Sequence, residues 1–316
     1  MSKRFCVTGT CIPAKNYMVD ISDRVDMIIH DYIDKGQYFT INRARQYGKT
    51  TTLYMLEQRL KSDYLVISLS FEAVDEYFAS LGTLAEGLMM DIAECLKNQN
   101  ASETIIEEWN EPLSDKFPLR SLGMKITRLC KASNKKVVLM IDEVDKSSDN
   151  QIFLSFLGLL REKYLKCQQG KDITFQSVIL AGVYDVKSLK LKIHPQEETK
   201  YNSPWNIAVD FSMDMSFNIN DIKSMLSDYE NEHRTGMDIE LIASIIYDYT
   251  SGYPYLVSRI CQLTDERIAS HEQDADEKKA WTKNGIVAVA NRIFETQLYD
   301  TFLSEMAVND RYNSRL

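Results

Sequence analysis

Residues 39–53 constrain the fold of this chain more than any other segment. They run from the apolar residues Phe39 and Ile41, through a loop that ends in Gly48-Lys49-Thr50, to the start of a helix. This strand–loop–helix order is typical of a phosphate-binding loop (P-loop), in which backbone N–H groups and the helix N-terminus surround phosphate oxygens. A strict P-loop begins with glycine five residues before Gly48, and this chain has Arg43 there. The tripeptide alone is therefore weak evidence.

The P-loop interpretation assigns a role to each residue type. Lys49 would reach the outer phosphates and take part in catalysis, and the hydroxyl of Thr50 would hold Mg²⁺. The predicted nucleotide-binding residues of the loop are Arg45, Gln46, Tyr47, Gly48, Lys49, Thr50 and Thr51.

A second segment supports this interpretation. Residues 137–141 are five consecutive apolar residues, followed directly by Asp142 and Glu143. Such a run suits a strand that is buried on both faces of a parallel sheet. Asp142 would hold the water shell of Mg²⁺, as a Walker B aspartate does, and Glu143 would polarise the attacking water. The alternative is an ordinary buried strand that leads into an acidic loop, but the two segments occur in the order that a nucleotide site requires.

Composition excludes several classes of protein. The chain has 316 residues, 44% hydrophobic and 26% charged, which is ordinary for a globular protein and enough for two domains. Its net charge of −9 does not indicate nucleic-acid binding over the whole protein, although it leaves a local basic patch open. The four histidines lie far apart and the six cysteines form no C-x-x-C pair, which predicts reduced thiols and no metal cluster. Without a long apolar run or a signal-peptide core, we predict a cytoplasmic protein with no membrane partner.

The pattern along the chain predicts two domains. Up to about residue 212, strands alternate with helices, which is typical of an α/β fold with a parallel sheet. Residues 99–117 are predicted to form an exposed insertion, and residues 186–204 a loop. The predicted strands are 38–42, 64–71, 137–141, 173–182 and 207–211, and the predicted helices are 20–35, 49–61, 76–98, 119–132 and 150–167.

From Asn220 onward the pattern is helical only, with predicted helices at 220–230, 237–249, 254–271 and 283–307. We therefore predict a P-loop α/β domain over residues 1–215 and a helical lid domain over residues 216–316.

Four segments together resemble the AAA-ATPase-like group of prokaryotic P-loop proteins, near the archaeal-type ATPases, the signalling STAND ATPases and the replication-origin initiator ATPases. The segments are Asn42–Thr50, Leu139–Glu143, Ala181–Val186 and Thr250–Pro254. In that group the loop often reads Arg-Pro-Arg-x-x-Gly-Lys, so Arg43 is a trait of the group, although Ala44 stands where proline is frequent. The resemblance implies a three-layer αβα sandwich of the additional-strand type, with strand order 5-1-4-3-2 and a C-terminal helical lid.

The resemblance also implies binding residues outside the loop. Gly252-Tyr253-Pro254 matches a lid turn that touches the adenine or ribose, and Arg259 would point at the γ-phosphate. Tyr17 and Met18 would pack on the adenine through backbone contacts. The alternatives are a helix-capping turn at residues 252–254 and a solvated helix arginine at Arg259.

Three further features follow from the same resemblance. The fourth strand should end in a sensor residue, and the chain offers Tyr184 and Asp185, neither of which is a standard choice. Arg161 would act in trans as an arginine finger, with an ordinary helix salt bridge as the simpler alternative. Many relatives carry a nuclease-like domain after the lid, which the residues after 285 are too few to form, so we expect either a short form or part of a longer chain.

The sequence thus predicts an ATP-binding ATPase that uses Mg²⁺, hydrolyses ATP and couples its nucleotide state to the position of the lid. Two alternatives stay open: a signalling switch with negligible turnover, and a DNA-associated ATPase of a mobile or defence element. Self-association and an unknown protein partner also stay open.

Overall fold

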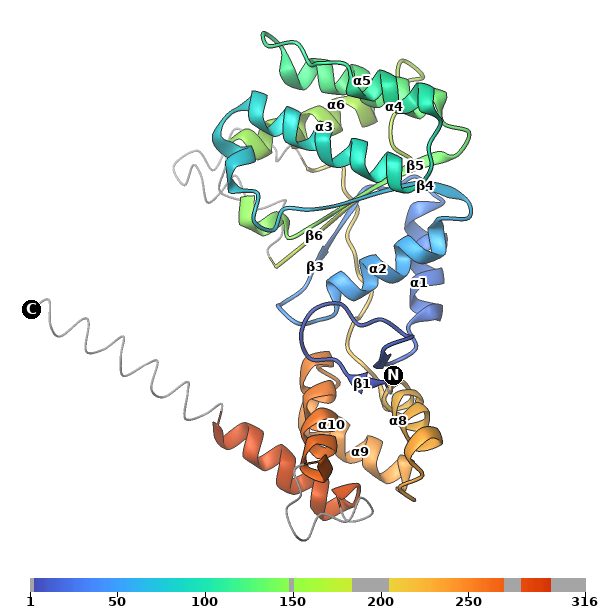
Figure 1. Cartoon of the computed structure of the whole chain (residues 1–316), viewed down its shortest axis with the longest axis vertical. Helices are drawn as coiled ribbons and strands as arrows, with labels where there is room; N and C mark the ends of the chain where they lie inside the picture. Colours follow the sequence, from blue (N-terminus) through green and yellow to red (C-terminus); the bar gives the residue numbers. More distant parts are fainter. Residues whose placement is uncertain (1–2, 148–150, 184–204, 270–279, 297–316) are drawn as a thin grey trace, which may run out of the picture. The chain divides into compact units, whose positions relative to one another are not determined.

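The computed structural model describes residues 3–147, 151–183, 205–269 and 280–296 (Figure 1). The chain forms two compact units. One, called here the α/β unit, comprises Ser22–Arg45 and Lys49–Met213; the other, the helical unit, comprises Met1–Ile21, Gln46–Gly48 and Asp214–Leu316. The domain boundary predicted after residue 215 stays a prediction. In this division, residues Met1–Ile21 belong to the same unit as Asp214–Leu316.

The α/β unit is built on a four-stranded parallel sheet. Its strands lie in the order β3 (Phe39–Asn42), β6 (Ser177–Gly182), β5 (Lys136–Asp142) and β4 (Tyr64–Ser70). Counted from the P-loop strand along the chain, this order is 1-4-3-2. Because all four strands are parallel, their carboxyl ends meet at one edge of the sheet, where ligands bind in open α/β folds.

The predicted fifth strand, residues 207–211, is reduced to one isolated bridge. The N–H of Val209 donates to the carbonyl of Tyr38 at 2.8 Å, and Val209 forms a parallel bridge with Phe39. The pairing is this short because residues 205–208 close a turn immediately before it, in which Ala208 N–H donates to the carbonyl of Trp205.

Helices cover both faces of the sheet (Figure 1). On one face lie α1 (Ser22–Ile28) and α2 (Lys49–Leu60); on the other lie α3 (Leu81–Asn98), α4 (Glu103–Asn110), α5 (Pro118–Ala132) and α6 (Gln151–Gln168). Along β5, Val137, Leu139 and Ile141 pack in the core with α3, α5 and α6, and the alternate residues Val138 and Met140 are equally buried. This burial on both faces explains the continuous apolar run of β5.

Several predicted elements have different bounds. The helix predicted at 20–35 ends as the π-helical turn Ile29–Ile33, and the strand predicted at 173–182 begins only at Ser177. The helix predicted at 76–98 is interrupted: a 3₁₀ helix, Asp75–Ala79, precedes α3. The break follows from a capping box, in which Ser80 Oγ accepts from Thr83 N–H at 3.0 Å and Thr83 Oγ1 accepts from Ser80 N–H at 2.9 Å.

In the segment predicted as an exposed insertion, residues 99–117, the helix α4 has one buried residue, and that residue anchors it. Trp109 is 2% exposed, and its indole N–H donates to the carbonyl of Met89 at 2.8 Å. The Nζ of the buried Lys125 donates to the carbonyls of Glu108 and Trp109, at 2.7 and 3.0 Å. These are carbonyls at the end of α4 that lack partners within the helix, so Lys125 caps α4 and fixes it against α5.

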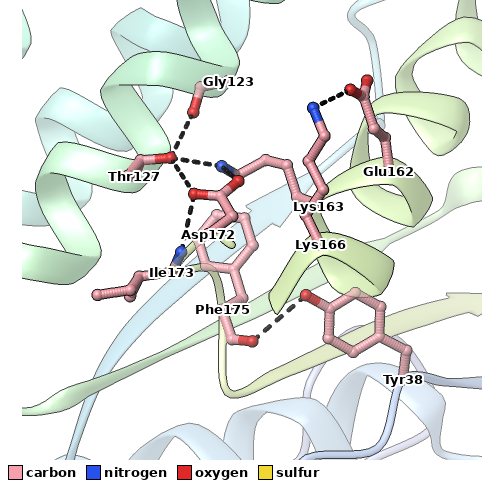
Figure 2. Close-up of polar contacts among 9 residues, drawn as sticks. All are labelled: Tyr38, Gly123, Thr127, Glu162, Lys163, Lys166, Asp172, Ile173 and Phe175. Atoms are coloured by element: carbon pink, nitrogen blue, oxygen red, sulfur yellow. Dashed lines mark hydrogen bonds and ion pairs between the residues drawn. The ribbon is translucent and has the colours of Figure 1, made fainter. Parts of the chain in front are cut away.

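A buried ion pair joins α5, α6 and the segment that leads to β6 (Figure 2). Lys163 Nζ lies 2.8 Å from Asp172 Oδ2 and donates to Thr127 Oγ1 at 2.6 Å. The hydroxyl of Thr127 and the N–H of Ile173 both donate to Asp172 Oδ1, each at 2.8 Å. Since the lysine and the carboxylate are both satisfied, the cluster holds the start of β6 in place.

The helical unit combines a short N-terminal ribbon with helices. Strands β1 (Arg4–Phe5) and β2 (Asn16–Tyr17) pair in parallel. The helices are α8 (Ile219–His233), α9 (Ile239–Thr250), α10 (Pro254–Ala269) and the helical residues 283–296, close to the predicted helices where the chain is described. The rings of Phe5, Tyr17, Tyr229 and Trp281 form its aromatic core. Within the described ranges, no helix combines the length and apolar character needed to cross a membrane.

Candidate functional site

The P-loop connects β3 to α2 at the carboxyl edge of the sheet. It spans residues 43–48, and its backbone turns through positive φ at Gln46 (62°) and Gly48 (75°). Arg45 and Gln46 are exposed and Tyr47 is half-buried. The N–H of Arg43, the first loop residue, donates to the carbonyl of Gly182 at 3.2 Å, so the loop starts from a fixed point on β6.

Lys49, the first residue of α2, is turned back into this loop. Its side chain is 8% exposed, and Nζ donates to the carbonyls of Arg43 and Ala44 at 2.9 and 3.0 Å. Burial lowers the pKa of Lys49, while the negative charges of Asp142, Glu143 and Asp145 act in the opposite direction. Lys49 therefore places a largely buried positive charge beside the start of the loop, where it can attract an anionic group.

Thr50 and Asp142 bring the two predicted motifs into direct contact. Thr50 Oγ1 donates to Asp142 Oδ2 at 2.6 Å, and Asp142, 8% exposed, uses Oδ1 to accept the N–H of Glu143 at 2.9 Å. The neighbouring Thr51 is buried in α2. A hydroxyl and a carboxylate are hard oxygen donors, which is the chemistry that Mg²⁺ prefers. Among the described residues, there is no group of three or more His, Cys, Asp or Glu side chains that could hold a metal ion.

Glu143 follows directly after β5. Its backbone has φ +55°, which is unusual for a residue with a side chain, and the side chain is half-buried. This left-handed turn comes immediately after Asp142, the last residue of β5. The predicted role of Glu143 in polarising water stays a prediction.

Asp145 is a site residue that the sequence analysis missed. Its Oδ1 accepts the N–H of Val183 at 3.0 Å, at the carboxyl end of β6. A Cβ added to Gly182 would lie 2.8 Å from the same oxygen, so glycine is required for this approach. Asp145 thus ties the acidic strand to the point where a sensor residue was expected. The candidates Tyr184 and Asp185 lie outside the described residues. The sequence signal that could have indicated Asp145 is that it is a third carboxylate, two residues after Glu143.

Tyr17 and Met18, predicted to contact adenine through their backbone, belong to the helical unit. The Tyr17 ring is 1% exposed, and its hydroxyl donates to Glu232 at 2.5 Å and lies 3.1 Å from His233 Nε2. Burial and the hydrogen bond to Glu232 raise the pKa of Tyr17. The ring is therefore committed to the core of the helical unit; Met18 is half-buried. The predicted backbone contact stays a prediction.

Gly252-Tyr253-Pro254 forms the turn between α9 and α10, and Pro254 is the first residue of α10. The carbonyl of Gly252 accepts the N–H of Phe217 at 2.8 Å. Within the same unit, the Tyr253 ring lies 4.9 Å from the ring of Tyr47, centroid to centroid. This contact associates the tip of the P-loop with the predicted lid turn.

The two predicted arginines have different surroundings. Arg259 Nη1 donates to Gln262 Oε1 at 2.7 Å along its own helix. Arg161 lies on α6, and its buried Nε has no hydrogen-bond partner among the described residues. Their predicted roles at a γ-phosphate are not tested by these contacts.

Comparisons with known proteins agree with this architecture. The model of the AAA-like domain family matches residues 15–300. Among solved structures, the Walker-type ATPase of Pyrococcus abyssi is 13% identical, with 95% of this chain and 79% of that chain covered and a TM-score of 0.51. The ORC2 protein of Aeropyrum pernix, in ADPNP–ADP complexes, is 11% identical, with 91% and 70% covered and a TM-score of 0.50. No curated protein matches this chain. The likeness to the two solved structures is one of fold: an α/β P-loop fold.

Proposed function

The chain belongs to the AAA-like domain family, and we propose that it binds ATP with Mg²⁺ at the P-loop and hydrolyses it. The observation that carries this proposal is the 2.6 Å hydrogen bond between Thr50 and Asp142. It joins two residues that lie far apart in the chain, next to the buried ammonium of Lys49. Phosphoryl transfer at a P-loop needs this set: a cation for the phosphates and a hydroxyl with a carboxylate for the metal.

Thr50 and Asp142 fit Mg²⁺ by their chemistry. Both offer oxygen, and Mg²⁺ usually takes only one or two protein ligands and keeps several waters. Thr50 would serve as a direct ligand, with Asp142 holding the water shell. The metal would neutralise negative charge on the phosphate oxygens.

Lys49 would bind the phosphates, and Glu143 would act as the general base. Lys49 would exchange the carbonyls of Arg43 and Ala44 for phosphate oxygens, which carry full negative charge and are therefore stronger partners. Glu143 would accept a proton from the attacking water, because it follows the metal-linked Asp142 without itself being needed for the metal.

Binding is tested with Lys49→Ala. Loss of the only buried cation of the loop should weaken ATP binding ten-fold or more, which is about 1.4 kcal/mol or greater. Lys61→Ala is the matched control, because Lys61 lies just beyond α2 and its ammonium forms a surface ion pair with Glu57. Calorimetry with Mg²⁺ and a non-hydrolysable ATP analogue measures both. Equal affinities for wild type and Lys49→Ala would contradict the P-loop assignment.

Hydrolysis is tested with Glu143→Gln, which should keep ATP affinity within a few-fold and lower turnover about 10²-fold or more, the scale of lost general-base help. The control is Glu86→Gln, on the exposed face of α3. Normal turnover of Glu143→Gln would remove this residue from the mechanism. A wild type that binds ATP without turnover would instead favour the signalling switch.

We also propose that nucleotide binding is coupled to the helical unit. If the turn at residues 252–254 senses nucleotide, ATP should slow amide exchange in residues 250–260 as well as in the P-loop, because only differential contact shifts a conformational equilibrium. Protection confined to residues 42–52 would leave this turn a structural feature. A steep salt dependence of DNA affinity would be the result that favours the DNA-associated alternative.

A further inference from the structure

Arg43 stands where a strict P-loop has glycine, and its backbone is part of the site. Its N–H is bonded to the carbonyl of Gly182, and its own carbonyl accepts one of the two hydrogen bonds from Lys49 Nζ. Any movement of Lys49 toward a phosphate therefore removes a partner from Arg43.

The side chain of Arg43 leaves the loop and holds a different segment. Nη2 donates to the carbonyl of Met213 at 2.7 Å and, more weakly, to that of Phe211 at 3.4 Å, while Nη1 donates to the carbonyl of Asn42 at 2.9 Å. The guanidinium carbon also lies 5.6 Å from the centre of the Phe211 ring. Phe211 itself is 6% exposed and stacks on Phe39. The guanidinium is thus fixed between the end of β3 and residues 211–213, the last residues of the α/β unit.

We propose that Arg43 is a positioning residue that couples the phosphate-binding loop to residues 211–213, the connection that continues into the helical unit at Asp214. The proposal rests on ATP binding at the P-loop, as proposed above. When Lys49 exchanges the Arg43 carbonyl for phosphate, the peptide of Arg43 shifts, and its guanidinium carries the shift to the carbonyls of Phe211 and Met213. We assign no phosphate contact to Arg43, because both of its terminal nitrogens donate to backbone carbonyls.

This role needs the shape of an arginine. The planar guanidinium presents donors in two directions at once, toward Asn42 and toward Met213, and its central carbon lies over the ring of Phe211. Lysine keeps the charge, but all of its donors sit on one nitrogen, so it cannot place donors as far apart as the two terminal nitrogens of the guanidinium. Glycine, the usual residue here, would leave residues 211–213 without this contact to the loop.

The contact is tested first without nucleotide, on the full chain. Arg43→Ala and Arg43→Lys should both speed amide exchange in peptides that cover residues 208–217, by about ten-fold, the scale expected for loss of hydrogen bonds from a charged donor. Arg59→Ala is the matched control, because Arg59 lies on α2 in an exposed ion pair with Asp26. Thermal unfolding of the three variants checks that each is folded, and Arg43→Lys, which keeps stem and charge, is the conservative one. Unchanged exchange in both Arg43 variants would overturn the proposal.

The coupling is tested second, with Mg²⁺ and a non-hydrolysable ATP analogue. In the wild type and in Arg59→Ala, binding should change the exchange of residues 208–217. Arg43→Lys should bind the analogue within about three-fold of wild type and show no such change, which an ordinary loss of stability would not produce. A ten-fold or greater loss of affinity with an intact exchange response would identify Arg43 as a phosphate ligand and overturn the proposal. A wild type that binds no analogue would refute ATP binding and the coupling together, whereas the nucleotide-free experiment judges the contact by itself.

Discussion

The substitution Gly252→Ala separates packing from nucleotide recognition at the turn between α9 and α10. Gly252 has φ +74°, and a Cβ added there would lie 1.9 Å from the carbonyl oxygen and 3.0 Å from the nitrogen of Phe217. Both are backbone atoms, so no rotation of a side chain can relieve the contact. The turn must open, and it must then lose the 2.8 Å hydrogen bond from Phe217 N–H to the Gly252 carbonyl.

The expected cost has two parts. A left-handed conformation costs an L-residue about 1–2 kcal/mol. Loss of the hydrogen bond adds about 1 kcal/mol, more if the freed groups stay buried. We therefore expect Gly252→Ala to destabilise the helical unit by about 2–3 kcal/mol.

Gly236 provides the matched control. It lies in the same unit with almost the same backbone angle, φ +76°, but nothing lies within 4 Å of an added Cβ. Gly236→Ala should therefore cost only the conformational part, about 1–2 kcal/mol. The difference between the two variants measures the close approach of Phe217 alone.

Native-state amide exchange is the assay, because it reports the free energy of opening of α8 to α10 without assuming that the two units unfold together. If both variants lower that free energy equally, the turn relaxes around a Cβ and the packing argument is wrong. Nucleotide contact would then be the better explanation for glycine at position 252.

Two further predictions concern the α/β unit. Gly182→Ala should displace Asp145 from the end of β6, since the new Cβ would lie 2.8 Å from its Oδ1. In urea denaturation, the double variant with Asp145→Ala should lose about 1 kcal/mol less unfolding free energy than the two single variants lose together. Strict additivity would contradict the contact. For Asp172, burial alone would raise the carboxyl pKa, but hydrogen bonds from Lys163, Thr127 and the backbone outweigh it and lower the pKa. Asp172→Asn should therefore lower the free energy of unfolding by about 3 kcal/mol at pH 7. This difference from the wild type should shrink as pH falls below about 4, because Asp172 takes up a proton first in the unfolded chain and then in the folded protein. A difference that stays constant between pH 7 and pH 3 would contradict the ion pair.

The centre of the site could be predicted because its signals are local. Lys49 and Thr50 follow a strand and a glycine, and Asp142 ends an apolar run, so each is placed by its own neighbours in the sequence. Only the parallel arrangement of the strands was needed to bring them together, and alternation of strands and helices predicts that arrangement.

Other parts depend on contacts between distant segments, which leave no periodic signal. The roles of Asp145 and of the Arg43 side chain follow from where β6 ends and where residues 211–213 pass, and neither position can be read from composition or spacing. The same holds for β1 and β2: strands of two residues carry no alternation pattern, and their residues Phe5 and Tyr17 pack on the distant Tyr229. Residues 207–211 do show an apolar run, but the turn before them limits pairing to one bridge.

The charges around Lys49 also bear on the form in which nucleotide would bind. Asp142, Glu143 and Asp145 all act on this one ammonium, and both Lys49 and Asp142 are buried. Free ATP would bring several negative charges toward three carboxylates, with Lys49 as the nearest compensating cation. In a region of low dielectric that repulsion is large. Mg²⁺ held by Thr50 and Asp142 would supply two positive charges that offset this repulsion. The hydrogen bond from Thr50 to Asp142 gives each of these groups a partner, and a bound metal would replace that interaction. If the P-loop binds ATP as proposed, the acidic end of β5 should disfavour metal-free nucleotide, and we expect the loop to prefer the metal complex.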